Sequence, residues 1–162
     1  MANYRYDYRT KEQFQKDVKD STLQENSLIK RWLDHVEAVT GERPVARRTS
    51  SKGAKGEYLE SKDVTADADF IVEGYGLVEV KFAKPLIKTN FHLKVSQVNK
   101  YIAQNANILM VNGAHTDSPK FAFIRTRRLR ELAAESEQVS WRGFGGKLAY
   151  RIPIRKVRWS SL

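Results

Sequence analysis

Apolar and polar residues alternate most regularly between Asp67 and Phe82. An apolar run at 70–72 and a second one at 77–82 are separated by Gly74 and Gly76. The two glycines supply the backbone freedom that a tight reversal requires. The pattern therefore predicts two strands that are joined by a turn.

The side chains of this predicted hairpin divide by position into an apolar set and a polar set. Successive strand residues point to opposite faces of a sheet. The even positions are apolar, namely Ala66, Ala68, Phe70, Val72, Val78, Val80 and Phe82, and the odd positions are Asp67, Asp69, Ile71, Leu77, Glu79 and Lys81. If the reversal is centred on Gly74, Asp69 lies opposite Glu79, with about 5 Å between their Cβ atoms. One face then contributes to the core, and the other carries two carboxylates beside the Lys81 ammonium.

This pair of carboxylates indicates a metal site. Two close carboxylates repel each other, so holding both ionised on a half-buried surface is costly unless a cation lies between them. Carboxylate oxygens on rigid strands suit Mg²⁺, which retains several waters and shares its coordination with substrate phosphate. Lys81 could then orient the attacking water or stabilise negative charge in the transition state. The alternative is a structural ion pair of Lys81 with Glu79 or Asp69 on a solvated sheet face.

Ahead of the hairpin, the sequence predicts an amphipathic helix and a strand. Thr22 and Glu25 match a capping box and Gly41 matches a helix stop, so the helix is expected over about 23–40. A short polar helix at 11–19 precedes it, and the strand is expected over 43–49. The helix has an apolar stripe of Leu28, Trp32, Val36 and Val39 with Leu33 beside it, and the strand points Val45 inward and alternates Arg47 with Arg48.

Behind the hairpin, the pattern predicts a loop at 83–92, a helix, two strands, a basic helix and further β structure. The first helix, at about 93–105, has an apolar stripe of Val95, Val98 and Ile102, with Lys94, Gln97 and Tyr101 on an adjoining face. Short apolar runs predict strands at 108–111 and 121–124, and the basic helix begins with four arginines within 125–130. The last β stretches are expected at 139–142, 148–152 and 156–159, with a hairpin turn at 143–147.

The composition is typical of one soluble domain. The chain has 162 residues, of which 41% are hydrophobic and 30% charged. No apolar run is long enough to span a membrane, no secretory signal is recognisable, and the absence of cysteine excludes disulfides and thiolate metal sites. We therefore expect a cytoplasmic, nucleoid-associated protein with no membrane partner.

The charge of the chain favours nucleic acid as a partner. The formal net charge is +10 and the sequence pI is about 9.8. The excess is localised, since residues 80–130 contain ten Lys or Arg and a single acid, Asp117. Basic residues in several segments are candidate phosphate contacts. They are Arg47 in the predicted strand, Lys52 and Lys55 in the Gly- and Ser-rich segment 50–56, Lys84, Lys88 and Lys94 around the second helix, and Arg125, Arg127 and Arg128 in the basic helix region.

Asp69, nine further residues and then Glu79-Val80-Lys81 resemble the PD-(D/E)xK motif of the restriction-endonuclease-like nucleases. Members of this superfamily include phage and archaeal Holliday-junction-resolving enzymes, type II restriction enzymes and homing endonucleases. Ala68 stands where the motif has its proline. The resemblance implies that Asp69, Glu79 and the Val80 carbonyl hold the metal and that Lys81 is the catalytic lysine.

The same resemblance implies further site residues and a fold. A helix ahead of the strands should deliver one more glutamate to the metal, either Glu25, the first choice, or Glu37, and Gln97 should reach the site from the second helix. The implied fold is α/β, with an αβββαβ core of mixed sheet and flanking helices and with a β-rich C-terminal extension. The core would span about 22–125 of a single nuclease domain, 1–162, with 1–21 and 126–162 as peripheral additions.

These observations lead to an Mg²⁺-dependent DNA endonuclease as the first hypothesis, with Mn²⁺ as a substitute metal. It would act on duplex or branched DNA, as a homodimer or higher homo-oligomer that resolves junctions or cuts specific sites, and a phage or mobile-element origin fits it. A non-catalytic basic nucleic-acid-binding protein is the alternative. An RNA-processing nuclease is the third interpretation, which the lack of clustered aromatic stacking motifs disfavours.

Overall fold

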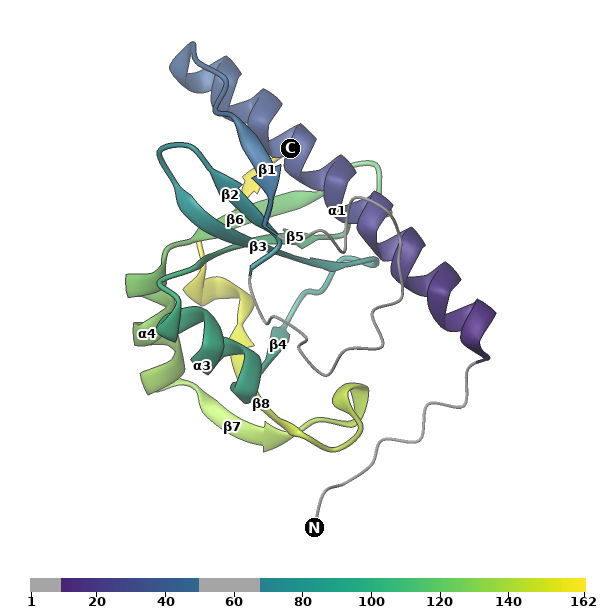
Figure 1. Ribbon diagram of the computed structural model, residues 1–162. Helices are drawn as coiled ribbons and strands as arrows, with labels where there is room; N and C mark the ends of the chain where they lie inside the picture. The colour runs from purple at the N-terminus through teal and green to yellow at the C-terminus, as the bar shows by residue number, and fades with distance from the viewer. Residues whose placement is uncertain (1–9, 50–67) are drawn as a thin grey trace.

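The computed structural model describes residues 10–49 and 68–162, which form an α/β structure with a mixed sheet (Figure 1). The main sheet has six strands in the order β1 (Ala46–Arg48), β2 (Phe70–Val72), β3 (Gly76–Ala83), β5 (Asn107–Asn112), β6 (Lys120–Ile124) and β9 (Ser160–Ser161). A second sheet has the order β4 (Asn90–Lys94), β8 (Leu148–Pro153) and β7 (Glu137–Ser140). The α-helices are α1 (Lys11–Thr40), α3 (Val95–Ala103) and α4 (Thr126–Glu135), and the short 3₁₀ helices are η1 (Arg142–Phe144) and η2 (Ile154–Lys156).

The main sheet has a hydrophobic core on each of its two faces. Helix α1 covers one face, where Leu28 and Trp32 pack with residues of β2, β3 and β5. Helices α3 and α4 and the second sheet cover the other face, as Figure 1 shows. Both faces are therefore enclosed, and the polar face expected from the hairpin pattern is partly buried. None of the helices in the described ranges is long and apolar enough to cross a membrane.

Helix α1 is one continuous helix of 30 residues, so helix is confirmed over 11–19 and 23–40, but the break predicted between the two stretches is wrong. The N-cap is Thr10, whose side chain accepts a hydrogen bond from the N–H of Gln13, while Thr22 lies inside the helix. The predicted end is confirmed, because Gly41 adopts the left-handed conformation with φ 82° and its N–H donates to the carbonyl of Glu37. Thr22 and Glu25 have the spacing of a capping box, but they do not begin a helix, because the residues on both sides of them are helical.

The apolar stripe of α1 is confirmed along most of its length but not at its end. Leu28, Trp32, Leu33 and Val36 are buried, whereas the side chain of Val39 is 70% exposed. Val39 lies in the last turn before Gly41 and is not among the residues of α1 that pack on the sheet.

The predicted hairpin is confirmed in its strands and its register. Phe70 pairs with Val78 and Val72 with Gly76, which centres the reversal on Gly74. Gly74 and Gly76 have φ of 79° and 77°, a region that residues with a side chain rarely adopt. The preceding strand is shorter than expected, since β1 covers only 46–48, and Val45 is exposed instead of pointing inward.

Strand β4 was not predicted, because 83–92 was expected to be a loop and the following helix was expected to begin at about 93. Phe91 and Leu93 are buried in alternation with His92, which is the period-two pattern of a strand. Strand β4 pairs with β8, and Ile152 of β8 is buried in the same core as Phe91. Residues after 126 therefore contribute to the core and are not peripheral additions.

The C-terminal β structure agrees with the prediction in part. Strands β7 and β8 are joined through the predicted turn at 143–147. The stretch predicted at 156–159 is not a strand: it overlaps the end of η2, and β9 follows it. The segment that contains Lys52 and Lys55 lies outside the described residues.

We predict that Trp32 anchors α1 to the sheet. Its ring stacks on Phe123 at a centroid distance of 4.9 Å and meets the edge of Tyr75 at 5.0 Å. Trp32→Ala should lower the free energy of unfolding by about 3–5 kcal/mol, since it leaves a large cavity. Val39→Ala, in the same helix, should change it by less than about 0.5 kcal/mol. Urea unfolding of both variants measures this, and equal effects would contradict the assigned packing.

Candidate active site

The carboxylates of Asp69 and Glu79 lie side by side at the start of the hairpin. The backbone N–H of Asp69 donates to Oε2 of Glu79 at 3.2 Å, and the N–H of Val80 donates to Oδ2 of Asp69 at 3.0 Å. Each carboxylate is therefore held by the backbone of the other strand segment. Asp69 directly precedes β2 and is not within the strand, but its position opposite Glu79 agrees with the register predicted from the sequence.

Glu79 is buried and is bound by two side chains. Its Oε1 accepts a hydrogen bond of 2.8 Å from the hydroxyl of Tyr101 and lies 3.1 Å from Nζ of Lys81. The ammonium of Lys81 also donates to Oε1 of Gln97 at 3.3 Å. Gln97 and Tyr101 are one turn apart on α3, so a rigid helix positions both of them. Lys81 and Gln97 are thus brought together with the carboxylates as the sequence predicted.

Tyr101 is the contact residue that sequence reasoning did not assign to the site. The sequence feature that could have identified Tyr101 is its position four residues after Gln97 on the polar side of the predicted helix, because residues four apart in a helix lie on the same face. The sequence pattern is equally consistent with an aromatic side chain that packs in the hydrophobic core. Its hydroxyl meets Glu79 only because α3 packs on the face of β3 that carries the carboxylate.

Glu25 is the helix carboxylate that the structure brings toward the pair. Its Oε2 lies 3.3 Å from a guanidinium nitrogen of Arg48, and both side chains are only 18% exposed. Arg48 also donates from Nε to the side chain of Asn26 at 3.0 Å. Glu37, the other candidate, is half-exposed near the opposite end of α1 and pairs with Arg43.

The charges of the three carboxylates act on one another. Burial, followed by the negative charges of Glu79 and then Glu25, raises the pKa of Asp69 to about 7, against the opposing effects of the Val80 N–H and of Lys81. Burial also raises the pKa of Glu25, although Arg48 opposes it. Burial and then the charge of Glu79 raise the pKa of the Tyr101 hydroxyl, which therefore stays protonated and donates to Glu79.

The donor set fits a hard divalent cation of the Mg²⁺ type. Within 10–49 and 68–162, no three Asp, Glu, His or Cys side chains are arranged to hold a metal by themselves. Mg²⁺ commonly uses one or two carboxylates and completes its shell with water and phosphate oxygens. Asp69 and Glu79 supply that pair. The N–H of Val80 points to Asp69, and since the N–H and C=O of a strand residue point to the same side, so does its carbonyl.

Among the predicted phosphate contacts, Lys84 and Lys88 lie in the exposed loop beyond the C-terminal end of β3. Asn112 holds this loop to β5, because its amide accepts from the N–H of Ile87 at 2.8 Å and donates to the Ile87 carbonyl at 2.9 Å. Lys94 lies with Nζ 5.2 Å from the ring centroid of Phe144.

The predicted arginines lie elsewhere. Arg47 is exposed on β1, at the edge of the main sheet. Arg125 lies over the rings of Tyr75 and Phe123, beside the hairpin turn and thus at the other end of β3 from Lys84.

The two remaining arginines belong to α4. Arg127 is 94% exposed. The guanidinium of Arg128 already binds Glu131 at 3.0 Å, Glu135 at 3.2 Å and the carbonyl of Lys156 at 2.9 Å, so it supports the packing of α4.

Comparisons of the chain with protein-family models, with curated proteins and with solved structures returned no match. The chemistry of the site therefore rests on its own geometry.

We predict that Asp69 destabilises the metal-free protein at alkaline pH. Its pKa is about 7 in the folded protein and 3.8 as the ordinary value, so the folded state binds a proton that the unfolded state has lost between these values. The contribution of Asp69 to stability is full below about pH 4 and declines as the pH rises through 7.

Asp69→Asn removes this charge and leaves an oxygen for the Val80 N–H. Relative to wild type in EDTA, the variant should gain about 1–3 kcal/mol in unfolding free energy between pH 5 and pH 8, measured by urea unfolding. Added Mg²⁺ should stabilise wild type and not the variant. The exposed Asp117→Asn is the matched control, and an identical pH response of both variants would contradict the prediction.

Proposed function

We propose that this protein is an Mg²⁺-dependent endonuclease that hydrolyses phosphodiester bonds in DNA. The observation that carries the proposal is the pairing of the partly buried Asp69 with the buried Glu79, in which each carboxylate accepts a backbone N–H from the segment of the other, with the Lys81 ammonium beside Glu79. Two adjacent carboxylates destabilise the folded protein when no cation lies between them. Destabilising arrangements of this kind are found mainly at functional sites.

Each residue of the site has a role that follows from its contacts. Asp69, Glu79 and the Val80 carbonyl would hold the metal, with Glu25 nearby as a further carboxylate. Bound Mg²⁺ would neutralise phosphate charge and make the attacking water more acidic. Lys81 places a positive charge where negative charge develops on the phosphoryl oxygens. Gln97 and Tyr101 fix the positions of Lys81 and Glu79 through single hydrogen bonds.

The order of elements supports membership of the PD-(D/E)xK superfamily. Helix α1 is followed by β1, β2 and β3, then by α3 and β5, and the strands lie side by side in the order β1-β2-β3-β5. This order supports the proposal of an αβββαβ core, in which β4 would be an insertion before α3. Asp69 directly before β2, and Glu79 and Lys81 on β3, support the same assignment.

The distribution of charge supports DNA as the substrate. The chain carries a net charge of +10, and Lys84 and Lys88 lie beyond the end of the strand that carries Glu79 and Lys81. Lysines at this place would contact the backbone on either side of the cleaved bond, so binding should weaken steeply with salt. A small nuclease that makes paired cuts works as a homodimer, which fits junction-resolving and site-specific activities alike.

One observation favours the alternative of a non-catalytic nucleic-acid-binding protein. Both oxygens of Glu79 already accept hydrogen bonds from this chain, from the Asp69 N–H and the Tyr101 hydroxyl, and Lys81 neutralises its charge. A structural ion pair would look the same. The raised pKa of Asp69 weighs against it, because a purely structural network gains nothing from a second, repelling carboxylate.

We predict metal-dependent cleavage that requires Lys81. Wild type should cut supercoiled plasmid or a synthetic four-way junction with Mg²⁺ or Mn²⁺ and leave both intact in EDTA. Lys81→Ala should lower the cleavage rate by about 100-fold or more, because it removes the charge nearest the attacked phosphate. DNA binding in EDTA, measured by fluorescence anisotropy, should be retained.

Lys100→Ala is the control, since Lys100 is an exposed lysine of α3 outside the site and its variant should cut normally. Tight DNA binding without cleavage under any metal condition would support the binding-protein alternative. Cleavage confined to RNA would keep the site and replace the substrate.

A further inference from the structure

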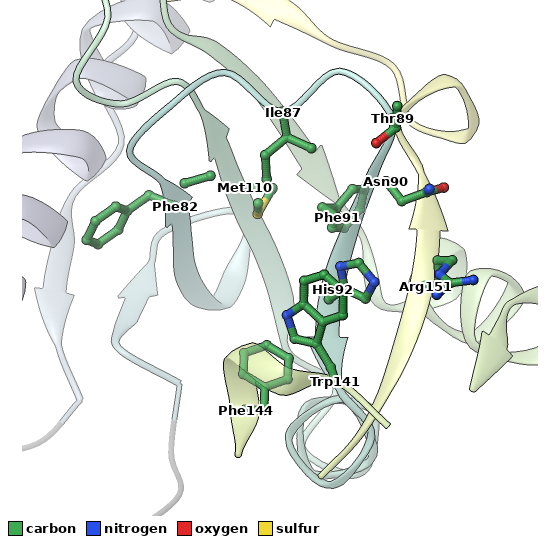
Figure 2. A pocket seen from close by; sticks show the side chains of 11 residues that line it. Phe82, Ile87, Thr89, Asn90, Phe91, His92, Met110, Trp141, Phe144 and Arg151 are labelled. Carbon is green, nitrogen blue, oxygen red and sulfur yellow. The ribbon is translucent and has the colours of Figure 1, made fainter. Parts of the chain in front are cut away.

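A cavity of about 560 Å³ opens beside the candidate active site. It lies between the end of β3, the start of β4 and the turn that joins β7 to β8, and it is lined by Ala83 and Met110 but by neither carboxylate. Figure 2 shows Trp141 and Phe144 gathered at one end and Ile87 and Met110 toward the other. Its size is within the range of pockets that hold small ligands or one part of a larger one.

The cavity has a flat aromatic wall. The ring of Trp141 stacks on His92 with 3.5 Å between centroids and 8° between planes. Burial, followed by the charge of Arg151, lowers the pKa of His92, so the imidazole is a neutral extension of the indole surface. Among the described residues, Nε2 of His92 is buried without a hydrogen-bond partner. Phe144 adds a second ring beside Trp141 (Figure 2).

Backbone hydrogen bonds close the turn that carries this wall. The N–H of Trp141 donates to the carbonyl of Lys147, and the N–H of Gly146 donates to the carbonyl of Trp141, both at 3.0 Å. Gly143 lies so close to the indole that a Cβ there would be 2.6 Å from Nε1 of Trp141. The glycine therefore lets the turn close against the ring. A larger residue at position 143 would push the indole of Trp141 away from the turn.

The cavity adjoins the catalytic lysine. Met110 is the residue of β5 that pairs with Lys81 of β3 across the sheet, and Ala83 follows Lys81 by two residues on the same face. Two residues of strand extend about 7 Å. A nucleotide whose phosphate is held at Asp69, Glu79 and Lys81 can therefore reach the cavity with its base.

A second hollow, of about 420 Å³, continues from the far side of the cavity. Thr89 and Asn90 line both hollows, and the second adds the cations Lys88 and Arg155. The order along the surface is thus carboxylate site, aromatic cavity, cationic hollow. This order matches one nucleoside with a phosphate on each side, since bases stack on aromatic rings and phosphates bind Lys and Arg.

We propose that the cavity receives one unpaired nucleobase of the DNA strand to be cut, stacked on Trp141, with the next phosphate at Lys88 and Arg155. The enzyme thereby selects branched, mismatched or single-stranded DNA over a fully paired duplex. This selection of substrate rests on the proposed nuclease function, whereas the binding of the base does not. A paired base could not enter, because it is stacked inside the duplex.

The test compares the binding of two DNA probes in EDTA, where nothing is cut. One duplex carries a single unpaired adenine, and the other carries an abasic residue at the same position. Wild type should bind the adenine probe about tenfold more tightly, and Trp141→Ala should reduce this ratio to below about twofold. Arg142→Ala, in the same turn but outside the cavity lining, should retain the ratio.

Gly143→Ala keeps the tryptophan but forces its ring to move, so it should also lose the preference. Fluorescence anisotropy gives the affinities, and circular dichroism verifies that each variant is folded. Equal binding of the two probes by wild type, or an unchanged ratio in both the Trp141 and Gly143 variants, would overturn the proposal. Base preference without any cleavage in Mg²⁺ would leave the cavity assigned and refute the nuclease. Cleavage in Mg²⁺ without any base preference would support the nuclease and refute the assignment of the cavity.

Discussion

Two carboxylates that repel each other are held side by side by the backbone on which they lie. The hairpin register centred on Gly74 sets Asp69 opposite Glu79, and each carboxylate accepts an N–H from the opposite strand segment. Neither side chain can turn away without breaking a backbone contact. Burial and then this repulsion raise the pKa of Asp69, and Lys81 and Tyr101 both contact Glu79.

The enclosing layers determine how strong this repulsion is. Helix α1 covers one face of the main sheet and α3 the other, so Glu79 is removed from water and its charge is poorly screened. The same two helices deliver the polar groups that respond to it, Glu25 from α1 and Tyr101 from α3. The site therefore lies where rigid elements meet, which is the arrangement that holds functional groups most accurately.

The site could be predicted from the sequence to the extent that it depends on local register. Alternation and the glycines were sufficient to place Asp69, Glu79 and Lys81 together, because a hairpin is specified by adjacent residues. Thr22 and Glu25 have the spacing of a cap but lie inside a longer helix, since their neighbours on both sides also favour helix. Val45 and Val39 look like core by hydrophobicity, yet they lie where elements end.

Contacts between distant elements gave no such local signal. Phe91 and Leu93 alternate as a strand does, but only pairing with β8 makes β4 a strand. Tyr101 could not be assigned to Glu79 before the packing of α3 was known. Arg125 and Arg128 belong to the same basic run of the sequence, and only the packing shows that Arg128 binds Glu131 and Glu135 whereas Arg125 lies over the ring of Tyr75.

The side chain of Asn112 makes the pair of hydrogen bonds to Ile87 that the backbone of a neighbouring strand would otherwise make. Its buried side-chain amide makes one hydrogen bond in each direction with the backbone of Ile87 and so holds the loop between β3 and β4 against β5. An aspartate there would keep the acceptor and lose the donor. The position of the loop that carries Lys84 and Lys88 therefore depends on one interior amide of β5, whereas the positions of Glu79 and Lys81 depend on β3, so a substitution at Asn112 can displace the loop lysines without displacing the β3 residues.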